Sequence, residues 1–315
     1  MEVLDFIFFV LLLGILFYSG GLLVRSLTVL GRYMQLSEYV VSFILVAFAT
    51  SLPEFFVGIN SALSGASLLS LGNIVGANML NISLVLGLAI IFAKGLDTSK
   101  TIEKEDMVFG FVIMVAPVLM AFDGIISRID GLVLLTGFIF YIIYLLKTEH
   151  KKSVFNEIRP SDAMRINPLK HFFLFLIAAA LLLASSSFVV SYAVELASYW
   201  ALPLFVVGIL VSFGTTLPEV VFSFKSVSLE HGSMSLGNVF GSIVVNISLI
   251  LGLAALINPI IIENLPRTII GLSLTAMMAV IIQIYSFKNS RLKPWLGFAL
   301  VFMALAFVVV EALIK

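Results

Sequence analysis

The chain has 315 residues, of which 61% are hydrophobic and 11% charged, and its formal net charge is zero. Soluble domains carry about 25% charged residues, so this composition excludes an ordinary soluble protein. The long uncharged runs approach the ~17–25 residues that cross a bilayer as a helix. There is no cysteine, which excludes disulfides, thiolate metal sites and cysteine nucleophiles.

Ten transmembrane helices account for these runs. The acidic start at residues 1–5 leads directly into an apolar stretch without the basic segment of a signal peptide, so we expect the first helix there. In chain order, helices are expected at about 4–29, 38–62, 68–93, 107–122, 130–146, 171–195, 202–227, 233–257, 266–287 and 292–313. The expected fold class is an all-α polytopic membrane protein.

The second half of the chain repeats the first at an offset of 165 residues. Eight of eleven residues are identical between 44–54 and 209–219, and thirteen of twenty between 70–89 and 235–254. Each half holds five expected helices, and because five is odd, the second half enters the membrane in the opposite orientation. The expected domains are two inverted five-helix repeats, 1–146 and 171–315, joined by a polar connector at 147–170.

Lysine and arginine indicate how the helices are oriented in the membrane. With the N-terminus outside, 15 of the 18 Lys and Arg residues lie on the cytoplasmic side, six of them in the connector. We therefore expect a multi-pass protein of the cell membrane with both termini outside and a cytoplasmic connector.

Each repeat places one acid in an otherwise uncharged stretch. Glu54 ends the sequence TSLPE at 50–54, and Glu219 ends its copy, TTLPE at 215–219. A carboxylate within the bilayer costs roughly 2.5–3.5 kcal/mol on insertion scales, so such a residue is a candidate for function. One copy alone would also fit a buried structural hydrogen bond, but two matched copies favour a functional site.

The proline before each acid interrupts its helix. Proline lacks an N–H and clashes with the carbonyl four residues earlier, so we expect the carbonyls of that turn to loosen. Hydroxyls, carbonyls and the carboxylate are then hard oxygen ligands, which suit Na⁺, Ca²⁺ or Mg²⁺. The candidates are Ala47, Thr50, Ser51 and Glu54 in the first half, and Ser212, Thr215, Thr216 and Glu219 in the second.

A second motif, SLGN followed by a glycine three residues later, begins the next helix in each half, at 70–76 and 235–241. The glycine spacing permits close helix packing. Asn81 in the first half, and Ser242 and Asn246 in the second, continue a polar stripe that would complete the ligand set. Asn73 and Asn238 fit interhelical hydrogen bonding equally well.

The paired motifs resemble the α-repeats of the sodium/calcium exchangers, in the cation/calcium antiporter superfamily, and above all its small prokaryotic members. The resemblance covers the whole chain and implies alternating access by sliding of the first and sixth helices across the other eight. It implies that Glu54 and Glu219 are shared ligands of Ca²⁺ and Na⁺, and that Thr50 and Thr215 bind calcium through their backbone carbonyls. It also implies sodium or water positions lined on one side by Ala47, Ser51 and Asn81, and on the other by Ser212, Thr216 and Ser242.

Two positions depart from the family pattern. Asn246 stands where members with a second-half acid carry aspartate, and Ala77 stands where a small hydroxyl residue is common. The asparagine argues against potassium co-transport, which the family links to that aspartate. The alanine removes one ligand from the first half and puts the affinity of one sodium position in question.

The function expected is a secondary antiporter that exchanges Na⁺ for Ca²⁺, electrogenically and without a cofactor or enzymatic activity. Its partners are the lipid bilayer and the transported ions, with no nucleic acid and no obligate protein partner. The alternative is an H⁺-coupled calcium or other divalent cation antiporter of the same fold, since two glutamates can also carry protons. An intramembrane enzyme lacks a matching motif, and only flux stoichiometry would separate a cation channel from an antiporter.

Overall fold

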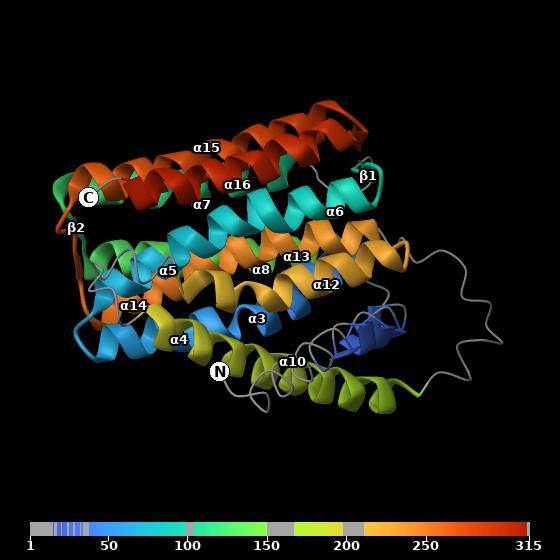
Figure 1. Cartoon of the computed structure of the whole chain (residues 1–315). Coiled ribbons are helices and arrows are strands. Elements are labelled where there is room, and N and C mark those ends of the chain that lie inside the picture. Colours follow the sequence, from blue (N-terminus) through green and yellow to red (C-terminus); the bar gives the residue numbers. More distant parts are fainter. Residues whose placement is uncertain are drawn as a thin grey trace.

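The computed structural model describes residues 38–98, 104–149, 167–197 and 211–313, together with parts of 15–33. Much of the first expected helix, most of the connector and residues 198–210 lie outside the described residues. Helices packed along a common direction form a bundle, in which α15, α16 and α7 lie on one side and α10 on the other (Figure 1).

The elements of the first half follow the predicted order with added detail. They are α2 (Glu38–Val41), the π-helix η1 (Ser42–Val46), α3 (Ala47–Thr50), α4 (Leu52–Leu63), α5 (Ser67–Leu80), the π-helix η2 (Asn81–Val85), α6 (Leu86–Phe92), β1 (Leu96–Asp97), α7 (Lys104–Met120), η3 (Ala121–Asp123), β2 (Ile125–Ile126) and α8 (Arg128–Glu149).

The described elements of the second half mirror this order. They are α10 (Pro168–Ala197), α12 (Leu217–Ser228), α13 (Gly232–Val244), the π-helix η5 (Val245–Ile250), α14 (Leu251–Ile257), β3 (Ile260–Ile261), α15 (Leu265–Lys288), β4 (Arg291–Leu292) and α16 (Pro294–Leu313). The four two-residue strands were not predicted.

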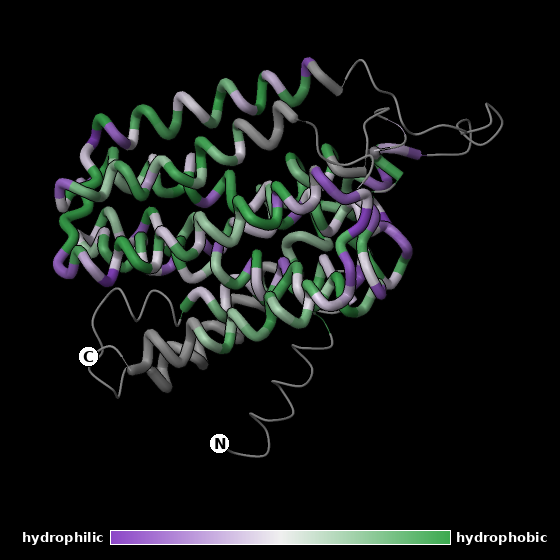
Figure 2. Tube along the Cα trace, turned by 90° about the horizontal axis from the view of Figure 1, so that it is seen from above, coloured by the Kyte–Doolittle hydropathy of each residue, from purple (hydrophilic) through white to green (hydrophobic). Residues whose placement is uncertain are grey.

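Several of these helices are suited to a membrane. Among the described residues, four are long and apolar enough to cross one, and a fifth span is formed if the pair Ser42–Thr50 and Leu52–Leu63, bent by 52°, counts as one. Figure 2 shows hydrophilic residues gathered at the two ends of the bundle, with hydrophobic residues along the helices between them. The chain is therefore a helical membrane protein; the predicted count of ten spans includes segments that the structure does not describe.

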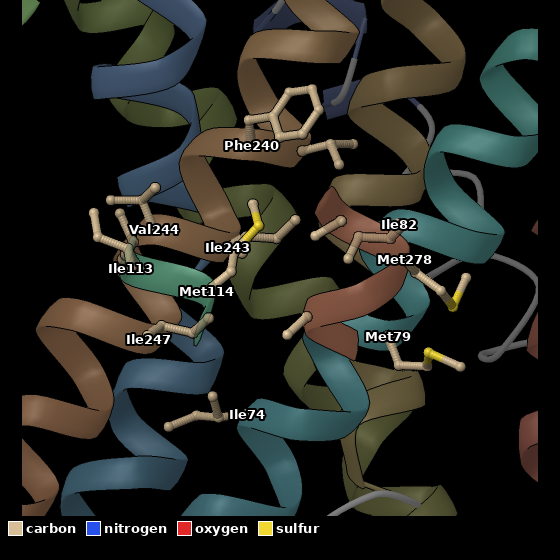
Figure 3. Close-up of a cluster of buried hydrophobic side chains, with 14 of the residues drawn as sticks. Ile74, Met79, Ile82, Ile113, Met114, Phe240, Ile243, Val244, Ile247 and Met278 are labelled. Carbon is tan, nitrogen blue, oxygen red and sulfur yellow. The ribbon is translucent and has the colours of Figure 1, made fainter. Parts of the chain in front are cut away.

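The two helices that carry the second motif form the centre of the bundle. The span Ser67–Phe92 is 83% buried and Gly232–Ile257 is 78% buried, whereas Arg128–Lys147 is only 22% buried. Ile113 and Met114 of α7 meet Ile243 and Val244 of α13 in the main hydrophobic core (Figure 3). The paired motifs thus lie on the most enclosed elements, where a polar side chain has little access to water.

The short strands pair between the halves. β1 pairs with β4, so that Leu96 faces Leu292, and β2 pairs with β3, so that Ile125 faces Ile261. The two pairs lie at opposite ends of the bundle (Figure 1). Each end of the bundle therefore carries one strand pair, and each pair contains one strand from each half.

Glycines allow matching helix crossings between the halves. A Cβ atom at Gly131 of α8 would lie 2.6 Å from the carbonyl oxygen of Gly252 in α14. A Cβ atom at Gly297 of α16 would lie 2.7 Å from the carbonyl oxygen of Gly87 in α6. Because both obstacles are backbone atoms, no side-chain rotation could relieve them, and these crossings require glycine.

A second hydrophobic cluster is separate from the main core. It joins Leu23 and Leu27, near the start of the chain, to Phe175 of α10 and to Val46 and Phe222 beside the acid-bearing segments. The described part of the first helix and α10 therefore share one packing layer against those segments.

We expect Gly131→Ala to destabilise the protein by about 1–3 kcal/mol, because the new methyl group would press on the α14 backbone. Gly137→Ala is the matched control, since Gly137 lies on the same helix and has nothing within 4 Å of its Cβ position. Thermal unfolding of both purified variants in detergent checks this. Equal melting temperatures for the two would contradict the importance of the crossing.

Candidate functional site

The first acid lies just after a break in its helix. α3 ends at Thr50, Ser51 adopts φ −81° and ψ 7°, and α4 begins at Leu52. Pro53 therefore occupies the first turn of a new helix, where its missing N–H costs no helical hydrogen bond. Glu54 lies in the same turn, at the positive end of the α4 dipole. The predicted interruption is confirmed.

The second acid has the same setting. Thr216 separates the helical residues before it from α12, and Pro218 and Glu219 lie in the first turn of α12. Ser51, three residues before Glu54, lies 3.5 Å from the Glu219 carboxylate, and both acids are fully buried. The fold thus brings the two predicted acids together from segments 165 residues apart.

The predicted loosening of two backbone carbonyls is not found. The Ala47 carbonyl accepts a hydrogen bond from the Ser51 N–H at 3.0 Å, and the Ser212 carbonyl accepts one from the Thr216 N–H at 2.9 Å. Pro53 and Pro218 each follow the donor residue by two positions, so the missing N–H of the proline does not affect either bond. Ala47 and Ser212 are both buried beside the acids. The Ser212 carbonyl also lies 3.3 Å from the Thr215 hydroxyl, a second donor.

The two halves hold each other through threonine and asparagine. The Thr50 hydroxyl donates to Asn238 Oδ1 at 3.2 Å. The Thr215 hydroxyl shares its proton between Asn73 Oδ1, at 3.4 Å, and the Ser212 carbonyl of its own segment, at 3.3 Å. Each bond from threonine to asparagine joins the acid-bearing segment of one half to the central helix of the other. Asn73 and Asn238 therefore act as interhelical partners, one of the two roles that the sequence left open.

The two carboxylates differ in their hydrogen bonds. Oε1 of Glu219 accepts long bonds from the hydroxyls of Ser51, at 3.5 Å, and Ser242, at 3.4 Å. Within the described chain, neither oxygen of Glu54 has a hydrogen-bond partner, although Thr215 lies close to it. Ala77 occupies the position that repeats Ser242, so the first half lacks the donor that the second half has.

Many buried polar atoms at this place have no hydrogen-bond partner in the described part of the chain. They are both oxygens of Glu54, both amide atoms of Asn81, Oγ1 of Thr216, Oε2 of Glu219 and Oδ1 of Asn246. Native structures leave only a few such atoms per hundred residues, and each one calls for an explanation such as an ion or a water molecule. Most of these atoms are oxygens, which is the chemistry that a hard cation requires.

Both candidate asparagines lie in π-helical turns, a feature that sequence reasoning missed. Asn81 begins η2, and Asn246 lies in η5. Two residues later, the hydroxyls of Ser83 and Ser248 donate to the carbonyls of Met79 and Val244. π-turns inside α-helices often mark functional sites, because the extra residue redirects the side chains around it. The identical NIS sequences of the two halves were the available signal.

The arrangement is suited to bind cations and lacks a cluster for a transition metal. Among the described residues, no three His, Asp or Glu side chains come together. The structure brings all eleven predicted site residues into buried positions on the elements that flank the two acids.

Comparison with known proteins identifies this arrangement. The sequence pattern of a family described as sodium/calcium exchanger protein matches residues 4–147 and 170–312. The chain belongs to the sodium/calcium exchanger family. The predicted resemblance is confirmed, and membership places the chain among membrane-bound cation/calcium exchangers, which are transporters.

Relatives of this exchanger cover nearly its whole length. The uncharacterized membrane protein MJ0091 of Methanocaldococcus jannaschii is 30% identical over 309 residues, which is 97% of each chain. The sodium/calcium exchanger MaX1 of Methanosarcina acetivorans is 28% identical over 351 residues, covering 96% of this chain and 97% of MaX1.

Solved structures of the sodium-calcium exchanger NCX_Mj share the fold of this exchanger. A crystal soaked with 2.5 mM Na⁺ and 0.1 mM Ca²⁺ gives a TM-score of 0.81 at 26% identity and covers 100% of both chains. A crystal soaked with 100 mM Na⁺ and 10 mM Sr²⁺ gives a TM-score of 0.81 at 25% identity, with 98% of this chain and 99% of the other covered.

We expect Thr50→Val to destabilise the exchanger by about 1–3 kcal/mol, because it leaves Asn238 Oδ1 buried without its donor. Thr275→Val is the control: Thr275 is also buried, but its hydroxyl bonds only to the Gly271 carbonyl of its own helix, at 2.8 Å. Thermal unfolding in detergent without Na⁺ or Ca²⁺ compares them. A loss for Thr275→Val as large as that for Thr50→Val would argue against a special role of the bond between the halves.

Proposed function

We propose that the protein is a secondary antiporter that exchanges Na⁺ for Ca²⁺ across the cell membrane. The observation that carries this proposal is the pair of buried acids, Glu54 and Glu219, surrounded by buried oxygens without hydrogen-bond partners. Calcium prefers six to eight oxygen ligands, and sodium is also a hard cation, so one set of oxygens can serve both ions in turn. We assign no enzymatic reaction, no cofactor and no nucleic-acid partner.

The site that we propose contains all eleven predicted residues. Glu54 and Glu219 are the shared ligands of both ions, and the carbonyls of Thr50 and Thr215 complete the calcium position. Ala47, Ser51 and Asn81 serve a sodium or water position on one side, and Ser212, Thr216 and Ser242 serve one on the other. Asn246 adds an amide oxygen. The unpaired atoms of Glu54, Asn81 and Thr216 support these roles.

The architecture that we propose is ten helices in two inverted repeats, 1–146 and 171–315, with 147–170 as a cytoplasmic connector and both termini outside. The matching strand pairs, β1 with β4 and β2 with β3, support an approximate two-fold relation between the halves. The two glycine crossings support it as well, since each joins one helix from each half.

Alternating access would come from the first and sixth helices. Leu23 and Leu27, from the described part of the first helix, and Phe175 of α10 belong to the second hydrophobic cluster, apart from the main core. Because the contacts of this cluster are apolar and non-directional, this layer can slide across the acid-bearing segments while the main core stays packed. This supports a motion of those two helices that exposes the ions to one side of the membrane at a time.

The charges of the site predict electrogenic exchange. Within the described chain, Glu54 and Glu219 are the only buried carboxylates. One Ca²⁺ neutralises two carboxylates, whereas three Na⁺ leave one positive charge in excess. Exchange of three Na⁺ for one Ca²⁺ would therefore move net charge.

An H⁺-coupled antiporter of the same fold is the alternative. The observation that favours it is that both oxygens of Glu54 lack a partner in the described structure, so that this carboxylate has room for a proton. The neutral Asn246 in place of an acid would fit that alternative too.

We expect calcium uptake into proteoliposomes that contain the purified protein only when they are loaded with Na⁺, and not with K⁺ or a proton gradient alone. Because Na⁺ would leave in excess charge, an inside-positive potential should accelerate uptake. Uptake driven by the proton gradient alone would establish the alternative, and absence of uptake under every gradient would exclude calcium as substrate.

We expect Glu54→Gln and Glu219→Gln each to abolish calcium uptake, because each removes a negative charge that balances the divalent cation. Glutamine has almost the same shape as glutamate, so both variants should keep the elution profile of the folded protein in detergent. Uptake in either variant at the wild-type rate would contradict the proposed site. Asn60→Gln, on the exposed side of α4, serves as a control with unchanged uptake.

A further inference from the structure

A hydrogen bond between two asparagines, one from each half, lies beside the site. Nδ2 of Asn246 donates a hydrogen bond to Oδ1 of Asn78 at 2.9 Å. Asn78 lies on α5 and Asn246 in η5, and both side chains are buried. At this length the bond is shorter than those that Thr50 and Thr215 make with their asparagines.

The bond determines which end of the Asn246 amide is available to an ion. An amide has a donor end and an acceptor end, and a cation binds only the oxygen. Because Nδ2 is used by Asn78, Oδ1 points elsewhere, and this buried atom has no hydrogen-bond partner among the described residues. Asn246 follows Ser242 by four residues, and Ser242 donates to Glu219, so Asn246 lies on the side of the helix that carries the site.

The first half has no equivalent of this bond. The offset of 165 residues places Ile243 at the position of Asn78, and Asn81 at the position of Asn246. Isoleucine cannot hydrogen-bond, and both amide atoms of Asn81 are without a partner in the described structure. The two halves thus treat their matching amides differently: a hydrogen bond holds the amide of Asn246, whereas the amide of Asn81 has none in the described structure.

Few polar groups near Asn78 could compete with Asn246 for a hydrogen bond to its side chain. Asn78 and Ile243 line the same small cavity of about 10 Å³, together with Met114, Pro117 and Thr275. Figure 3 shows Ile243 of α13 and Met114 of α7 next to each other in the hydrophobic core. The Thr275 hydroxyl donates to its own helix, and most of the other lining residues are apolar. Asn246 is therefore the hydrogen-bond partner that this site provides for Asn78.

We propose that Asn78 is a positioning residue, which holds the Asn246 amide so that its oxygen faces the transported ions. This inference rests on the proposed function, since it concerns how the same site binds Ca²⁺ and Na⁺. Without Asn78, the Asn246 amide could rotate and turn its NH₂ group, which repels cations, toward them. Asn78 itself does not touch the ions.

The test is a double-mutant cycle on the full-length protein. Variants Asn78→Leu, Asn246→Ala and the double variant are compared by calorimetric Ca²⁺ and Na⁺ binding in detergent and by uptake in proteoliposomes. Because one buried hydrogen bond is at stake, we expect Asn78→Leu to weaken ion binding about fivefold, with the maximal rate of uptake unchanged. In the Asn246→Ala background, Asn78→Leu should have no further effect, because the residue on which it acts is gone.

Two further variants separate positioning from packing. Ile243→Val alters the same cavity without touching either amide, so ion affinity should stay within twofold of the wild type. Asn78→Asp keeps an acceptor for Asn246 Nδ2 and should bind Ca²⁺ at least as tightly as the wild type. If Asn78→Leu does not fold, Asn78→Ser, whose side chain is too short to reach Asn246, takes its place with the same expected loss.

The outcomes distinguish the two proposals. Wild-type protein that neither binds nor transports Ca²⁺ overturns the proposed function. Wild-type protein that does both, with an Asn78→Leu effect that persists undiminished in the Asn246→Ala background, overturns the positioning role alone. An Asn78→Asp variant as weak as Asn78→Leu does the same, because it would show that the acceptor is not what matters.

Discussion

Burying two neighbouring carboxylates in the centre of an apolar bundle costs free energy, and this is the constraint on which the rest of the structure depends. Neither Glu54 nor Glu219 has a basic residue to balance it in the described structure, and both are fully buried. The protein places each at the start of a helix, where the dipole favours negative charge, and surrounds them with hydroxyls and amides. The bonds from Thr50 to Asn238 and from Thr215 to Asn73 hold these two helix starts against the opposite central helices. In the proposed function, the transported ions would balance the charge of the two carboxylates.

Contacts in which one half of the chain pairs with the other recur throughout the bundle. Strand β1 finds its partner in the second half and β3 finds its partner in the first, at opposite ends of the molecule. The close crossings of Gly131 with Gly252 and of Gly87 with Gly297 fix the outer helices on the central ones. Because a backbone carbonyl blocks each of these positions, neither crossing leaves room for a side chain. The described part of the first helix and α10 pack in a hydrophobic cluster that is separate from the main core.

The sequence predicts the helical membrane fold, the broken helices and the pairing of Glu54 with Glu219, because these follow from hydropathy, proline and an internal repeat. It does not predict the π-turns at Asn81 and Asn246. An extra residue shifts the phase of the side chains that follow, but these helices are buried on almost every side, so the shift leaves no mark in the hydropathy pattern. It also does not reveal Asn78, because its repeat partner is Ile243 and a comparison of the halves passes over it. The bonds kept by the carbonyls of Ala47 and Ser212 depend on where each helix ends, which a sequence fixes only to within one or two residues.

Because of the alanine at position 77, the two carboxylates of the site are restrained to different degrees. Glu219 is tethered by the hydroxyls of Ser51 and Ser242, whereas Glu54, opposite Ala77, has no such tether in the described structure. The two hydroxyls limit how far the Glu219 carboxylate can turn. The Glu54 carboxylate lacks that restraint in the described structure, so it can turn over a wider range. Under the proposed function, the site would therefore combine one carboxylate that is held in place with one that can adjust its position to the ion it meets.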